Sequence, residues 1–104
     1  MIFRRSRWAE LIDGQLDLFV REHPDVVDEA RVRLALYNAA DRDEAEELYG
    51  DYVDAVETGT ELLADIRDHF KWTLEEELGE AYERDFNKAV GKRLPVFALE
   101  LENR

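Results

Sequence analysis

The chain has 104 residues, no cysteine and a formal net charge of −12 at pH 7. This length corresponds to one domain, 1–104, with a modest core, and the absence of cysteine excludes disulfides, thiolate metal sites and thiol nucleophiles. A field of this sign disfavours nucleic acid and anionic membranes and favours basic partners.

The apolar residues are too interrupted for a membrane protein. No apolar run approaches the ~20 residues of a membrane span, and no apolar stretch follows the basic N-terminal residues, as a signal peptide would require. We therefore expect a cytoplasmic protein. Its excess of Arg over Lys, with abundant Ala, Asp and Glu, suggests a GC-rich bacterial genome.

Two helices are predicted in the first forty residues. The first covers 7–22, with Ser6 as its N-cap, and it ends before Pro24 because the residue preceding a proline avoids the α region. The second covers about 26–40, with Asp25 as its N-cap. Its apolar residues form two stripes, which indicate burial on two sides, inside a monomer or in a dimer. One stripe comprises Val27, Ala30, Leu34 and Tyr37, and the other Val32, Leu36 and Ala39.

The most regular pattern predicts one long helix over about 42–77, with Asp41 as its cap and Glu44 three residues later, which is the spacing of a capping box. Apolar or small residues recur there at alternating steps of four and three, which is typical of a helix packed against other helices. These are Ala45, Tyr49, Tyr52, Val56, Gly59, Leu63, Ile66, Phe70 and Thr73. The helix would be ~53 Å long, about twice the first or the second. Either it breaks near Gly50 or Gly59, or the shorter helices cover different halves of it, or a second copy covers the excess length.

The C-terminal region predicts a helix over 80–92, with Gly79 as the C′ residue of the long helix and Pro95 as a stop. In the tail, Phe97, Leu99 and Leu101 partly alternate with acidic residues. This pattern fits a short strand that meets residues 1–3, a last helical turn, or an extended arm on the core.

Two alternative functions depend on acidic residues. A metal site in the long helix would use Glu61, Asp65, Asp68 and His69, which lie within about two turns. The chain has only two histidines and no Glu-x-x-His pair, so a solvated acidic face is the simpler interpretation. The second alternative is an acidic decoy that imitates nucleic acid and occupies a basic protein. It would use the carboxylates of residues 41–61, which are Asp41, Asp43, Glu44, Glu46, Glu47, Asp51, Asp54, Glu57 and Glu61.

The predicted fold is therefore all-α, a three- or four-helix bundle whose spine is the long helix, with a short extended C-terminal tail as one option. The predicted function is a non-enzymatic protein–protein interaction module that forms a homodimer through the long helix, without catalytic residues, metal ligands or a cofactor. A basic protein is the other expected partner; nucleic acid and membrane are not expected. The expected interface residues, some of which must belong to the core, are Tyr49, Tyr52, Val56, Leu63, Ile66, Phe70 and Trp72.

Overall fold

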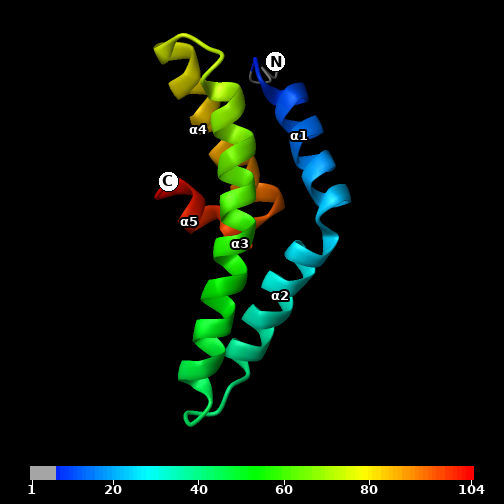
Figure 1. Ribbon diagram of the computed structural model, residues 1–104, viewed down its shortest axis with the longest axis vertical. Helices are drawn as coiled ribbons and strands as arrows, with labels where there is room; N and C mark the ends of the chain where they lie inside the picture. The colour runs from blue at the N-terminus through cyan, green and yellow to red at the C-terminus, as the bar shows by residue number, and fades with distance from the viewer. Residues whose placement is uncertain (1–6) are drawn as a thin grey trace, which may run out of the picture.

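The computed structural model describes residues 7–104, which form five α-helices and one 3₁₀ turn, without a strand among them. The elements are α1 (Ala9–Glu22), α2 (Pro24–Asn38), α3 (Ala45–Lys71), α4 (Glu76–Arg93), η1 (Pro95–Phe97) and α5 (Ala98–Glu102) (Figure 1). The prediction of an all-α bundle around a long helix is confirmed, because α3 contacts α2, α4, η1 and α5. None of the helices within 7–104 combines the length and the apolar character of a transmembrane span.

Helix α3 is continuous through Gly50 and Gly59 and has 27 residues, so it spans about 40 Å. It ends at Lys71 rather than Glu77, and no side chain caps its N-terminus, so the predicted capping box is wrong. The shorter elements share its length between them. Helix α2 packs along the N-terminal half, whereas α4, η1 and α5 pack along the C-terminal half, and α1 packs on α4 (Figure 1).

Proline both ends α1 and starts α2. Helix α1 ends at Glu22, and Pro24 is the first residue of α2, a position where the missing N–H costs nothing. The predicted start near Val26 with Asp25 as the N-cap is therefore wrong; the cap position is His23, which makes no side-chain cap bond. The Ser6 cap and the contact of residues 1–3 with the tail lie outside the described residues.

The last helices begin earlier and extend later than predicted. Helix α4 starts at Glu76, so Gly79 is buried inside it and is not a C′ residue. The tail is helical, because Phe97 and Leu101 are four residues apart and share one buried face of the η1–α5 turn. Leu99 is exposed. The strand option and the extended-arm option are therefore both wrong, and the last-turn option is confirmed.

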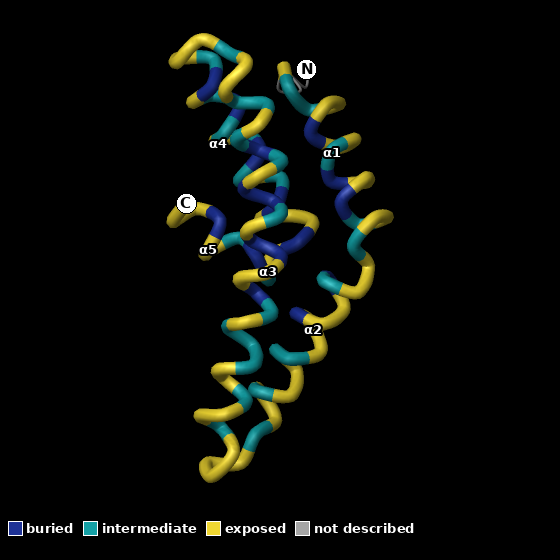
Figure 2. The backbone as a smooth tube through the Cα atoms, viewed as in Figure 1, coloured by how far each residue is buried: buried dark blue, intermediate teal, exposed yellow. Residues whose placement is uncertain are grey.

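The core lies where α1, the first turns of α2, α4, η1 and α5 meet α3, mainly along its C-terminal half (Figure 2). Its apolar members are Ile12, Leu16, Phe19, Val27, Ala30, Val56, Leu63, Ala64, Tyr82, Phe86, Val90, Leu94, Phe97 and Leu101. By contrast, no residue between 31 and 55 is buried. We call residues 31–55 the hairpin arm: two antiparallel helix segments and their loop, which extend beyond the core.

Candidate interaction surfaces

The structure divides the seven expected interface residues into three groups. Val56 and Leu63 are buried, Tyr52, Ile66 and Phe70 are half-buried against the core, and Tyr49 and Trp72 are exposed. The seam of α3 is thus mostly occupied by the chain's own helices and does not offer a continuous apolar edge to a partner. Trp72 is 76 % exposed at the C-cap of α3.

The exposed Tyr49 belongs to an aromatic cluster in the hairpin arm. Its ring centroid lies 5.2 Å from that of Tyr37 on α2 and 6.2 Å from that of Tyr52. The rings of Tyr37 and Tyr52 are nearly parallel, with centroids 6.3 Å apart. These ring contacts connect α2 to α3 within the hairpin arm, which contains no fully buried side chain.

The outer side of α2 carries an apolar stripe that no other element of residues 7–104 covers. Val32 is 52 % exposed and Leu36 is 44 % exposed, and Ala35 and Ala39 are exposed beside them. Val32, Leu36 and Ala39 come two positions after Ala30, Leu34 and Tyr37 of the first predicted stripe, and two positions correspond to a rotation of about 200° around the helix. The predicted second stripe of α2 therefore faces away from α3. We call Val32, Ala35, Leu36 and Ala39 the outer stripe.

A second open apolar surface is the groove between α1 and α3, with a volume of about 250 Å³. It is lined by Gln15, Leu18, Phe19, Glu22, His23, Leu62, Asp65 and Ile66. Leu18 is 44 % exposed, and Leu11, two turns earlier on the same side of α1, is exposed as well. Glu22 on α1 and Asp65 on α3 are exposed at the rim, so the groove has apolar walls and an acidic border.

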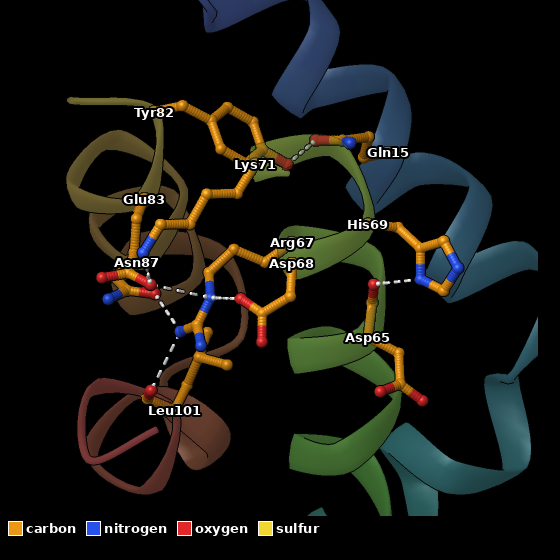
Figure 3. Close-up of polar contacts among 10 residues, drawn as sticks. All are labelled: Gln15, Asp65, Arg67, Asp68, His69, Lys71, Tyr82, Glu83, Asn87 and Leu101. Carbon is orange, nitrogen blue, oxygen red and sulfur yellow. Dashed lines mark hydrogen bonds and ion pairs between the residues drawn. The ribbon is translucent and has the colours of Figure 1, made fainter. Parts of the chain in front are cut away.

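Gln15, which lines this groove, also connects α1 to α4 through a hydrogen bond. The hydroxyl of Tyr82, a fully buried residue of α4, donates a hydrogen bond of 2.8 Å to Oε1 of Gln15 (Figure 3). Burial disfavours the phenolate and raises the pKa of Tyr82 to about 12. The Tyr82 ring also contacts Trp8 and Phe70 edge-on or tilted, so this end of the groove is fixed by packing.

A buried arginine, which the sequence reasoning missed, holds the C-terminal helix on α3. Arg67 is fully buried; its Nη1 donates to the carbonyl oxygen of Leu101 and to Oδ1 of Asn87, both at 3.1 Å (Figure 3). Its Nε donates to Oδ1 of Asp68 at 2.9 Å and lies 3.4 Å from Oε1 of Glu83. The Leu101 contact satisfies a carbonyl in the last turn of α5. The available signal was a line of small residues, Thr60 and Ala64, that ends in Arg67 beside the α3 seam.

The side chains of the hypothetical metal site point to different partners. Asp68 pairs with Arg67, Asp65 borders the α1–α3 groove, and Nδ1 of His69 lies 3.1 Å from the carbonyl oxygen of Asp65 (Figure 3). Within the part of the chain that the structure describes, no three His, Cys, Asp or Glu side chains are placed to hold a metal ion.

Comparison of the chain with protein-family models, curated proteins and solved structures gives no match.

Proposed function

We propose that the protein is a helical interaction module that associates with a second copy of itself through the outer stripe of α2. This moves the predicted self-association from the seam of α3 to α2, because the seam is largely buried within the chain. The supporting observation is a pair of half-exposed aliphatic side chains, Val32 and Leu36, one turn apart on the side of α2 opposite α3.

The charge of α2 favours a second copy as the occupant of the outer stripe. Helix α2 contains three carboxylates and two arginines, a net charge of −1, in a chain whose total is −12. A surface without a strong charge neither repels its own copy nor requires an oppositely charged partner. In an antiparallel, two-fold arrangement, Val32 of each copy lies opposite Leu36 of the other, so the stripe is complementary to itself.

The rest of the hairpin arm is compatible with this pairing. Small side chains at Ala35 and Ala39 let the axes of two helices approach closely. The carboxylates of residues 41–47 lie at the tip of the arm, and an antiparallel arrangement places the two tips at opposite ends of the dimer. Two helical hairpins that pack in this way form a four-helix assembly, in which the arm acquires the packing that it lacks in one chain.

The small size of the stripe predicts a weak dimer. Burial of the exposed parts of four aliphatic side chains, two from each copy, contributes roughly 3–6 kcal/mol. Ala35 and Ala39 add smaller apolar areas, whereas association costs at least about 4 kcal/mol of translational, rotational and side-chain entropy. We therefore expect a weak dimer, with a Kd of about 1 mM or higher.

Sedimentation velocity over a concentration series up to about 1 mM tests the proposal. We expect the weight-average sedimentation coefficient to rise with concentration for the wild type and to stay at the monomer value for Leu36→Lys. Leu18→Lys is the matched control, because Leu18 has the same exposed fraction but lies on α1, outside the stripe. A wild type that stays monomeric, or a Leu36→Lys variant that associates like the wild type, would refute the proposal.

A further inference from the structure

We propose that the α1–α3 groove binds an amphipathic helix with basic flanking side chains, supplied by a different protein. This inference goes beyond self-association, since it concerns another surface and another kind of partner.

The groove has apolar walls on two helices, α1 and α3, against which the apolar face of a third helix can lie. Helix α1 rises about 21 Å over its 14 residues, which gives room for three to four turns of a partner helix beside it. Leu18 and Phe19 on one side and Leu62 and Ile66 on the other provide apolar walls. A helix that lay between α1 and α3 would pack its side chains into the grooves of both.

Exposed aliphatic side chains extend the apolar surface beyond the groove itself. Leu11 and Leu18 are seven residues apart on the same side of α1, a spacing that matches two turns of a helix lying alongside. A partner with apolar residues at i, i+3 or i+4, and i+7 would contact both leucines as well as Ile66 on α3.

The charges at the border decide between possible partners. Glu22 and Asp65 stand on opposite sides of the groove, and neither makes an ion pair with any residue of 7–104. Lysine or arginine on either flank of an apolar helix face would pair with them, while the long aliphatic stems cover apolar surface. The same groove of a second copy would bring carboxylates against carboxylates, an unfavourable arrangement.

A synthetic leucine–lysine peptide with its leucines on one helical face is a direct probe. Its scrambled counterpart, of equal composition and charge, serves as the control for non-specific attraction to an acidic protein. With ¹⁵N-labelled protein, we expect the amphipathic peptide to shift the backbone resonances of residues around Leu18, Leu62 and Ile66. The scrambled peptide should bind at least about tenfold more weakly, because it cannot fill the groove with apolar side chains.

Two sets of variants, read by fluorescence anisotropy with labelled peptide, locate the site. Leu18→Lys should weaken binding by about tenfold, and its matched control, Leu36→Lys, should leave the affinity unchanged. Removal of the two border charges, Glu22→Gln with Asp65→Asn, should weaken binding by about fivefold. The same loss of charge at the arm, Glu46→Gln with Glu47→Gln, should have little effect.

Three results would overturn the inference. They are equal affinity for the amphipathic and scrambled peptides, resonance shifts centred on the hairpin arm, and an unchanged affinity in Leu18→Lys. If Leu18→Lys instead abolishes self-association, the groove is a contact between copies, and both the inference and the proposed function are wrong. Leu36→Lys is the test variant for dimerisation and the control for peptide binding, and Leu18→Lys is the reverse. A failure of one proposal can therefore be distinguished from a failure of the other.

Discussion

The replacement Gly59→Ala gives a sharp test of the packing between α3 and η1. A Cβ atom at position 59 would lie 2.2, 2.5 and 2.9 Å from Cε1, Cζ and Cδ1 of Phe97, whereas carbon atoms normally approach to about 3.5–4.0 Å. The Phe97 ring would therefore have to move by more than 1 Å by this estimate. The ring is fully buried and meets Phe19 edge-on, with centroids 6.2 Å apart, so it has little room to move.

Two opposing terms set the size of the effect. Alanine is the better helix former by about 1 kcal/mol in a helix interior, which would stabilise the variant. Overpacking a well-filled core typically costs about 1–3 kcal/mol, and here the buried ring and the α5 helix that follows it both have to shift. We expect the clash to prevail, with a net loss of about 1–2 kcal/mol. Such a loss lowers the melting temperature by several degrees.

Gly50→Ala is the matched control on the same helix. Apart from the adjacent residues and the backbone of α3 itself, no atom of the described residues lies within 4 Å of a Cβ at Gly50. Only the propensity term therefore applies, and the variant should gain up to about 1 kcal/mol. Urea unfolding followed by circular dichroism, at a protein concentration well below that of dimerisation, gives both free energies. In a Phe97→Leu background, which removes the ring, Gly59→Ala should no longer destabilise. Equal stabilisation by both glycine replacements, without coupling to position 97, would refute the reasoning.

Three further predictions concern the stability of the helix packing. Arg67→Ala should lower the free energy of unfolding by about 2–4 kcal/mol, because it empties a fully buried position and removes the donor to the buried carbonyl oxygen of Leu101. Arg67→Met should cost less, because its side chain still fills part of that buried volume, and urea titrations of both variants check this. The phenol of Tyr82 has a pKa near 12 when folded against 10.0 as its ordinary value, so its contribution to stability is complete below pH 10 and is lost as the pH rises from 10 to about 12. Tyr82→Phe should flatten this decline in urea midpoints measured across that range. Amide hydrogen exchange should be faster in residues 45–55 than in residues 60–67 of the same helix, because the hairpin arm contains no buried residue.

Periodicity predicted the existence of the helices better than their ends. The seam of α3 predicted helical structure over this stretch because apolar residues recur at steps of four and three, but it left open a break at Gly50 or Gly59. Its C-terminus was misplaced because Gly79 was interpreted as a stop. In the structure Gly79 fits a helix crossing: its Cβ would lie 3.1 Å from Cγ of Lys71, so the missing side chain lets α4 pass close to the end of α3. A sequence does not distinguish these two uses of glycine.

The open surfaces were predictable in part. The two stripes of α2 follow from the sequence, but which of them faces α3 depends on tertiary packing. The α1–α3 groove arises from the position of α1, which packs on α4 and is tied to it through Gln15 and Tyr82. These residues are 67 positions apart, and no local pattern links them. Arg67 was missed for a similar reason: its burial results from elements that converge from α4 and α5.

Salt should act in opposite directions on the two proposed interactions. Two copies of the chain carry −12 each and repel at long range, and raising NaCl from about 0.1 M to about 1 M shortens the Debye length from about 10 Å to about 3 Å. Because the outer stripe itself is nearly neutral, screening removes repulsion without removing attraction, and sedimentation should show a stronger dimer at high salt. Binding of the basic peptide depends on the attraction that salt screens, so its affinity should fall over the same range. If both affinities change in the same direction, net charge does not separate the two surfaces, and the assignment of a like partner to α2 and a basic partner to the groove loses its physical basis.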